Sequence, residues 1–221
     1  MAIASPAALV VVLVVAFLLG SIPWGVVIGK AFYHTDIRTV GSGNIGTTNA
    51  MRALGRKGGI AVFLLDFGKG VVTGLIALLV GHMAAAGGGM FAGSLLTCDD
   101  LLAVAFFGCI TGHIFSPWLK FHGGKGIAVA VGALFSVFGP VGALIEIALF
   151  AVLVGATRYV SLGSVAAAVL CPFLSAYFFW GDWLAWGLCT LSALIVIWAH
   201  RQNIHRLLTG TERRLGDKKE A

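Results

Sequence analysis

The sequence predicts an all-α polytopic membrane protein with about seven transmembrane helices. Of its 221 residues, 59% are hydrophobic and only 11% are charged, with a mean hydropathy of +0.98. Soluble domains carry about 25% charged residues. Several apolar runs also reach the roughly 20 residues that a membrane helix needs. We therefore expect residues 1–221 to form one integral membrane domain.

The first two spans carry features beyond hydrophobicity. The first covers about 7–29, and Pro23 should kink it. No basic segment precedes it, so we expect a retained helix and not a cleaved signal peptide. The second span, about 60–80, holds Asp66 and Lys69 three residues apart on one helical face, where they can form an ion pair.

The remaining spans follow from apolar length. The third covers about 101–119, after a Gly/Ala-rich connection over 81–100 to which we assign no function. Residues 127–157 are too long for one ordinary span, and Gly139-Pro140 is a natural turn, so we divide them into two short spans. The sixth and seventh cover about 162–179 and 183–199, and a polar, basic tail follows.

The basic residues predict the orientation. With seven spans, Lys69 is the one Lys or Arg inside a span, and the other 14 fall on one side of the membrane. The opposite connections hold Asp99, Asp100 and Asp182 without Lys or Arg. Because cytoplasmic loops are enriched in Lys and Arg, the N-terminus should be outside and the C-terminus cytoplasmic. The net charge of +6 then points to anionic lipid or an anionic substrate, and not to nucleic acid.

A first polar motif, Gly-Ser-Gly-Asn-Ile-Gly-Thr-Thr-Asn-Ala-Met-Arg, covers 41–52. Its glycines expose backbone N–H groups and Arg52 supplies a planar cation suited to phosphate, so we interpret it as an anion-handling loop. The alternative is a glycine-rich turn beside an arginine that follows the positive-inside rule. The motif also matches G-x-G-x-x-G, but no strand precedes it, so we treat the dinucleotide pattern as accidental.

A second motif, Gly123-Gly124-Lys125-Gly126, comes directly before an apolar helix. Free N–H groups and the positive end of the helix dipole could hold a phosphate there, with Lys125 as a point charge. It is not a Walker A loop, because Leu119 stands at the first glycine position. An ordinary basic loop is the alternative. For His113, nearby at the end of a span, we favour a satisfied structural histidine.

A third motif begins at His200. His200 and Asn203 share a face of the last helix, where they could position a hydroxyl or accept a proton. For the basic tail residues we favour contact with anionic lipid head groups. These are Arg213, Arg214, Lys218 and Lys219.

Other chemically active residues give weaker signals. Glu146 lies inside a span, where an acid is a functional candidate, but a neutral carboxyl that packs by hydrogen bonding is an equal alternative. The four cysteines lie far apart without metal-ligand spacing, so we interpret them as packing residues. We predict no metal and no cofactor.

The motifs together resemble the bacterial acyl-phosphate-dependent glycerol-3-phosphate acyltransferases. The resemblance extends in order over nearly the whole chain. It rests on Gly-Ser-Ile-Pro at 20–23, Asp-Ile-Arg at 36–38, the motif at 41–52, Gly-His-Ile-Phe-Ser-Pro-Trp-Leu-Lys-Phe-His-Gly-Gly-Lys-Gly at 112–126, Arg-Tyr-Val-Ser-Leu at 158–162, and His-Arg-Gln-Asn-Ile-His-Arg-Leu-Leu-Thr-Gly-Thr-Glu at 200–212.

The resemblance implies a seven-helix enzyme of the bacterial inner membrane. It would transfer a fatty acyl group from acyl phosphate to the 1-hydroxyl of glycerol 3-phosphate, giving lysophosphatidic acid and phosphate, the first acylation of phospholipid synthesis. Acyl-CoA and acyl carrier protein would not be donors. We expect the protein to contact the lipid bilayer and to function as a monomer.

The resemblance also implies roles for individual residues. Three match the family's catalytic positions: His200, Asn203 and Ser42. Those three also match glycerol-3-phosphate-binding positions, together with Arg52 and Lys125. The loops that handle the donor phosphate comprise Gly43, Asn44, Thr47, Asn49, Gly123, Gly124, Lys125 and Gly126. Thr47 stands where the family usually has Ala, and Gln202 where it usually has Glu.

The predicted chemistry is direct acyl transfer. An acyl phosphate is already activated, so no covalent enzyme intermediate is needed, and the enzyme's task is to align the hydroxyl and stabilise the developing charge. Either His200 or the departing phosphate could take the proton. A transporter for a phosphorylated metabolite and a lipid-binding scaffold are the rival interpretations. Transporter sites lie near the midplane within repeats, whereas these motifs gather at one face and no internal repeat is found.

Overall fold

The computed structural model describes residues 3–217, and over that range the chain is helical without a β-strand. The β-bridges within that range are two isolated ones, between Ala4 and Ala92 and between Ala4 and Leu96. The helices are α1 (Pro6–Ser21), α2 (Trp24–Tyr33), α3 (Thr47–Ala85), α4 (Cys98–Ile114), α5 (Ile127–Val137), α6 (Gly139–Thr157), α7 (Val160–Phe178), α8 (Trp183–Ala199) and α9 (Arg201–Leu208). Three short 3-10 turns, Ile37–Thr39, Gly89–Phe91 and Pro117–Leu119, join them. The predicted all-α class is confirmed.

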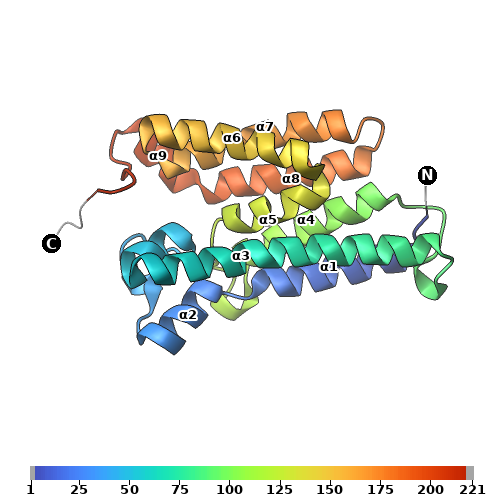
Figure 1. Cartoon of the computed structure of the whole chain (residues 1–221), viewed down its shortest axis with the longest axis horizontal. Coiled ribbons are helices and arrows are strands. Elements are labelled where there is room, and N and C mark those ends of the chain that lie inside the picture. The colour runs from blue at the N-terminus through green and yellow to red at the C-terminus, as the bar shows by residue number, and fades with distance from the viewer. Residues whose placement is uncertain (1–2, 218–221) are drawn as a thin grey trace.

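The long helices lie side by side along the long axis of the molecule, with α4 at the centre of the bundle (Figure 1). Residues along almost the whole of α4 are buried, and it packs against α1, α3, α5 and α8. Close approach relies on small residues: a Cβ on Gly70 of α3 or Gly132 of α5 would collide with a backbone carbonyl of the other helix. Small residues of this kind are typical of helix packing in membranes.

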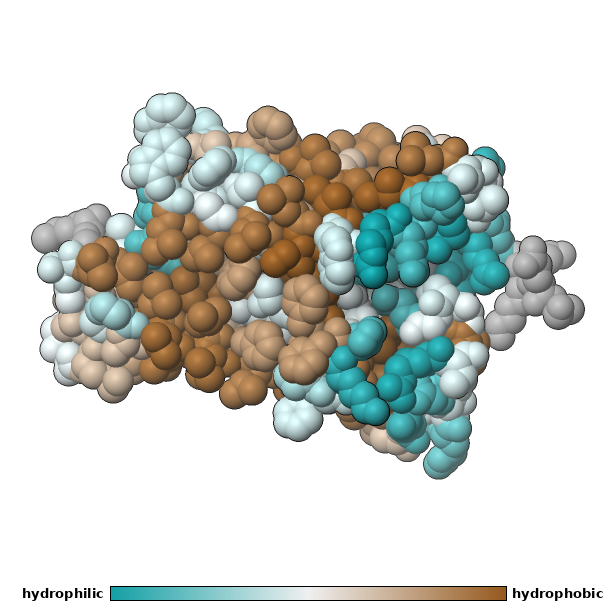
Figure 2. All heavy atoms as spheres, turned by 180° about the vertical axis from the view of Figure 1, so that it is seen from behind, coloured by the Kyte–Doolittle hydropathy of each residue, from teal (hydrophilic) through white to brown (hydrophobic). Residues whose placement is uncertain are grey.

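The surface divides into an apolar body and a hydrophilic end. Figure 2 shows hydrophobic residues over most of one face and hydrophilic ones gathered at the end that carries the C-terminal segment. At the opposite end, the connection between α7 and α8 exposes Tyr177, Trp180 and Trp183. Aromatic residues of this type are enriched where a protein crosses the membrane–water interface. The distribution fits an integral membrane protein.

The number of candidate spans is five by length and composition among the described residues, or six if α8 and α9 count as one bent span. α5 falls short, because 11 residues rise only about 16 Å, against a hydrocarbon core of about 30 Å. Thus the run over 127–157 does contain two helices, but only the first is short. The seven-span count and the orientation remain predictions.

The break at Pro23 is larger than the predicted kink. The helix stops at Ser21 and a new one starts at Trp24, because proline lacks the N–H that would continue the ladder. Lys69 of α3 compensates: its Nζ donates to the carbonyls of Gly20 at 2.7 Å and Ile22 at 2.8 Å. The break thus becomes a contact between α1 and α3.

The predicted division at Gly139-Pro140 lies at the observed break, whereas the predicted start of the second span was wrong. The chain turns at Phe138 and Gly139, whose φ is +65°, and Pro140 lies in the first turn of α6. Proline is favourable at the start of a helix because its missing N–H is not needed there. α3 begins at Thr47 instead of near residue 60, with a non-helical residue at Gly55, so the second half of the first motif is helical.

The connection over 81–100, which had no assigned role, caps α4 and contacts the capping residue of α8. The Thr97 side chain and Asp100 form a capping box at the start of α4. Thr97 Oγ1 also donates to Asp182 Oδ2 at 2.8 Å, and Asp182 in turn caps α8 through Ala185 N. The acids at this end therefore fix the starts of α4 and α8.

Candidate active site

A cavity of about 750 Å³ opens between the three polar motifs. Its lining includes residues of all three, among them Ser42, Arg52, Lys125, His200 and Asn203. A second part of the lining is apolar and runs between α4, α5, α6, α7 and α8, with Phe106, Leu134, Phe150, Ala168 and Val196. The cavity therefore joins a polar compartment to an apolar chamber.

The turn over 41–46 is held from inside by Asn49, which is buried. Asn49 Oδ1 accepts from Ser42 N at 2.9 Å, and Asn49 Nδ2 donates to the carbonyls of Ile37 and Asn44, both at 2.8 Å. Gly41 has a φ of +64°, and a Cβ there would collide with Asn49 Oδ1. Asn49 lines the cavity, but its amide is used by the loop itself, so it positions the loop.

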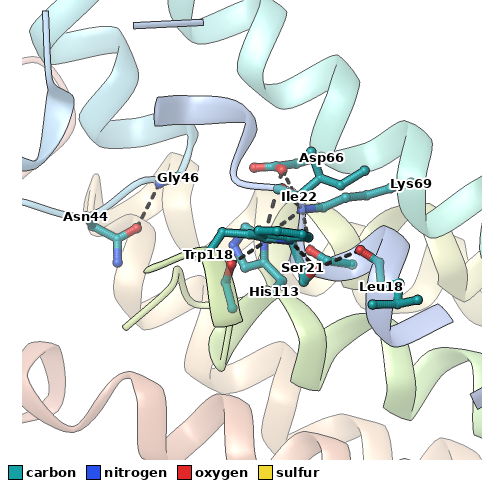
Figure 3. Close-up of polar contacts among 11 residues, drawn as sticks. Leu18, Ser21, Ile22, Asn44, Gly46, Asp66, Lys69, His113 and Trp118 are labelled. Carbon is teal, nitrogen blue, oxygen red and sulfur yellow. Dashed lines mark hydrogen bonds and ion pairs between the residues drawn. The ribbon is translucent and has the colours of Figure 1, made fainter. Parts of the chain in front are cut away.

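The N-terminus of α3 faces the cavity without a side-chain cap. Its N-cap residue is Gly46, whose N–H donates to Asn44 Oδ1 at 2.9 Å (Figure 3). Thr47, Thr48 and Asn49 form the first turn, where backbone N–H groups have no partner within the helix. Thr47 Oγ1 is buried without a hydrogen-bond partner in the described part of the chain. This arrangement is suited to an anion.

The N-terminus of α5 is the second uncapped helix start at the cavity. Its N-cap residue, Gly126, has a φ of +81° and offers no side chain, and Gly123, Lys125 and Gly126 line the cavity. Gly124 does not line it: a Cβ there would collide with His113 Nε2, and Gly124 N donates to the carbonyl of His113 at 3.1 Å. Gly124 thus seats the loop on α4, and its contact with the donor phosphate remains a prediction.

A buried ionic cluster supports this loop from behind. Lys69 Nζ lies 3.0 Å from Asp66 Oδ1, which confirms the predicted pair, and 3.0 Å from His113 Nδ1 (Figure 3). Since an ammonium only donates, His113 Nδ1 is the acceptor. Beside this cluster, Trp118 Nε1 donates a hydrogen bond to Ser21 Oγ at 2.8 Å. His113 is therefore the satisfied structural histidine that the sequence favoured.

The third motif places His200 and Asn203 together at the junction of α8 and α9, and both are buried. His200 Nδ1 lies 2.8 Å from the carbonyl of Val196, so Nδ1 carries a proton and donates it. In a neutral imidazole, Nε2 then keeps its lone pair. His200 is thus oriented to accept one hydrogen bond from a ligand in the cavity.

A chain of polar contacts crosses the cavity mouth. Lys125 Nζ donates to Asn203 Oδ1 at 2.5 Å, and Asn203 Nδ2 donates to Glu212 Oε1 at 2.6 Å. Arg206 Nε lies 2.6 Å from Glu212 Oε2. The chain links the second motif to the third, 78 residues away in sequence.

Burial and neighbouring groups shift the pKa values of Lys125 and Glu212, two members of this chain of contacts. Burial lowers the pKa of Lys125 to about 8; the Glu212 charge opposes this shift, whereas the Arg206 and Arg52 charges add to it. Burial raises the pKa of Glu212, but the hydrogen bonds from Asn203 and Arg206 oppose burial, and this pKa lies below its usual value. Lys125 is therefore a cation that loses its charge near pH 8.

The tail returns over the cavity. Leu215 N donates to the carbonyl of Arg158 at 2.7 Å, and the Arg158 guanidinium donates to the Leu215 carbonyl. Arg213 lines the cavity, and Arg214 lies over the Tyr159 ring at 5.2 Å. Both side chains are also exposed, so their predicted contact with anionic lipid head groups remains a prediction. Lys218 and Lys219, assigned the same role, lie outside the described residues.

Sequence reasoning missed Glu212 and gave Arg206 no specific role. Glu212 ends the segment over 200–212, and an acid in a basic tail was the available signal. The bonds from Asn203 and Arg206 to Glu212 could not be predicted from spacing, because they depend on how the chain turns after Leu208.

The fold and the cavity define a class: a polytopic membrane protein with two uncapped helix starts and basic side chains around one polar compartment that opens into an apolar chamber. Residues 10–210 match the family described as glycerol-3-phosphate acyltransferase. The chain belongs to this family and is therefore an acyltransferase.

Curated relatives and solved structures agree. The glycerol-3-phosphate acyltransferase of Anaeromyxobacter sp. is 43% identical over 93% of this chain and 95% of its own, and that of Syntrophotalea carbinolica is 42% identical over 92% and 96%. A crystal structure of PlsY, an integral membrane glycerol 3-phosphate acyltransferase in its glycerol 3-phosphate form, is similar with a TM-score of 0.77 and 35% identity. It covers 94% of this chain and 96% of that one. A lysophosphatidic acid form of PlsY has a TM-score of 0.74.

Proposed function

We propose that the protein transfers a fatty acyl group from acyl phosphate to the 1-hydroxyl of glycerol 3-phosphate, at the cytoplasmic face of the bacterial inner membrane. The observation that carries the proposal is the pairing of two uncapped helix starts with Arg52 and Lys125 around one compartment. Both substrates bear phosphate, so two anion sites are required. The apolar chamber offers room for the acyl chain.

The acceptor site is formed by Ser42, Arg52, Lys125 and Asn203. Arg52 supplies a planar fork for the phosphate of glycerol 3-phosphate, and Lys125, tied to Asn203, supplies a second cation. The donor phosphate lies against Gly43, Asn44 and Thr47 and at the start of α5. The related PlsY crystal structures, in a glycerol 3-phosphate form and a lysophosphatidic acid form, support the same acceptor and product.

The transfer is direct. The glycerol oxygen attacks the acyl carbonyl carbon, the bond from that carbon to the phosphate oxygen breaks, and inorganic phosphate leaves. No serine or cysteine among residues 3–217 is hydrogen-bonded to His200, so no activated protein nucleophile is evident. Backbone N–H groups at the helix starts stabilise the negative charge on the carbonyl oxygen. His200 Nε2 accepts the hydrogen bond of the glycerol hydroxyl and aligns it.

The destination of the proton is either His200 Nε2 or the departing phosphate. A pH–rate profile of His200→Ala at saturating substrate separates the two. If His200 is the base, the variant loses the ionisation that limits the rate at low pH. A residual rate with an unchanged pH dependence assigns the proton to phosphate.

The deciding experiment uses purified protein in lipid. Palmitoyl phosphate and glycerol 3-phosphate should give lysophosphatidic acid without CoA, and palmitoyl-CoA should give none. Absence of product from folded protein with palmitoyl phosphate would overturn the proposal. A single-copy nanodisc preparation that retains full activity would support function as a monomer.

A further inference from the structure

Glu146 is a buried acid deep in the apolar chamber. It lies in α6, is 6% exposed, and lines the cavity. Twelve positions separate it from Arg158 at the polar end of α6, which corresponds to about 18 Å along a helix. Glu146 is therefore too far from the phosphate-binding compartment to contact the phosphate of either substrate.

The surroundings of Glu146 leave one carboxyl oxygen unsatisfied. Oε1 is buried and has no hydrogen-bond partner among residues 3–217. The Glu146 carboxyl interacts with the thiol of Cys171 in α7, and this thiol also lies 3.9 Å from the carbonyl oxygen of Cys189. A thiol has one proton and donates weakly, so it cannot satisfy both carboxyl oxygens.

A packing role does not account for this oxygen. A buried polar group without a partner destabilises the fold, and buried acids in membranes are usually paired. A straight alkyl chain in the chamber would cover the carboxyl and leave the oxygen unsatisfied. A hydroxyl at the same depth would form a hydrogen bond with it.

We propose that Glu146 forms a polar subsite within the acyl chamber that recognises a hydroxyl or other oxygen-bearing group in the interior of the donor's acyl chain. This subsite rests on the proposed function, because it requires the acyl chain to occupy the chamber. It would make the enzyme select donors by the position of an oxygen along the chain.

The test is a competition between acyl phosphates of one chain length in the purified, lipid-reconstituted enzyme. One donor is unsubstituted, and the others carry a single hydroxyl at successive positions. The wild-type enzyme should prefer one hydroxyl position by about tenfold in kcat/KM, the scale of one hydrogen bond. Glu146→Leu should remove that preference, and Glu146→Gln should retain part of it.

Thr190→Val is the matched control. Thr190 also carries a buried hydroxyl without a partner, but it is not among the residues lining the cavity, so donor preference should not change. Equal use of all donors by wild-type enzyme, or an unchanged preference in Glu146→Leu, would overturn the subsite. If Glu146→Leu does not fold, the comparison of hydroxyl positions in the wild-type enzyme still tests the subsite. Failure of the proposed function is distinct, because then the unsubstituted donor would give no lysophosphatidic acid.

Discussion

Lys69 and Lys125 differ in how many of their three ammonium protons donate hydrogen bonds. Lys69 donates all three, to Gly20 O, Ile22 O and His113 Nδ1, and lies against Asp66. Lys125 donates one, to Asn203, and no second acceptor is found in the described part of the chain.

This difference in hydrogen bonding distinguishes Lys69, which stabilises the fold, from Lys125, which has donors available for a ligand. A saturated buried cation has no capacity left for a ligand, and it holds α1, α3 and α4 together. An ammonium with unused donors beside a cavity can bind an anion. Arg52 resembles Lys125, because it also lines the cavity. Its guanidinium is repelled by the charges of Arg213 and Arg206 and attracted by those of Glu212 and Asp217.

The largest expected effect is on stability, in Lys69→Met. It leaves Asp66 buried without its cation and frees two carbonyls, which should destabilise the protein by about 3–5 kcal/mol. Thermal unfolding in detergent measures the loss. Lys57→Met, an exposed change on the same helix, should leave the unfolding temperature unchanged. A fully stable Lys69→Met protein would contradict the scaffold assignment.

Arg52→Ala should instead reduce activity without loss of stability. Removing a charged donor to phosphate should lower kcat/KM for glycerol 3-phosphate by about 100-fold. The unfolding temperature should stay within a few degrees, since no buried partner is left behind. Arg56→Ala, four residues further along α3, exposed and outside the cavity lining, is the control and should retain normal kinetics. Comparable losses in both variants would argue against a specific phosphate contact.

Lys125 should impose a pH dependence on acceptor use. Its pKa of about 8 means that the cation is present below pH 8 and is lost as the pH rises through that value. Therefore kcat/KM for glycerol 3-phosphate should fall about tenfold between pH 7 and pH 9, a profile that reports the free enzyme. Lys125→Arg should be flat over this range, because arginine stays charged. A fall of equal size in Lys125→Arg would assign the ionisation to another group.

Glu212→Gln should give the smallest effect and refine the same profile. The Glu212 charge raises the pKa of Lys125, so neutralising it should move the fall in kcat/KM to a lower pH. Gln keeps an oxygen that can accept from Asn203, which preserves the contact chain. The measurement is the midpoint of the pH profile, and a midpoint that moves upward would contradict the assigned electrostatics.

Sequence patterns predicted the features that are local. Hydropathy located the helices, and the spacing of Asp66 and Lys69 predicted their ion pair, because residues three apart share a helical face. The start of the second span was predicted too late, because the helix begins at Thr47 and continues past the non-helical Gly55. The three polar motifs were expected to converge, and each contributes residues to one cavity.

The roles within that cavity needed the tertiary structure. Asn49 and Gly124 belong to motifs that suggest phosphate contact, yet one holds its own loop and the other seats against His113. Nothing in their spacing distinguishes a residue that faces a cavity from one that faces a neighbouring helix.

By itself the sequence determined the all-α membrane class and the three polar motifs that line one cavity, since these follow from composition, hydropathy and local residue types. Only the tertiary structure decided which polar groups are already satisfied. The bonds from Lys69 to Gly20, from Lys125 to Asn203 and from Arg158 to Leu215 join residues 49, 78 and 57 positions apart. Hydrogen bonding over such separations depends on how the helices pack, and packing decides which donors remain available for a ligand.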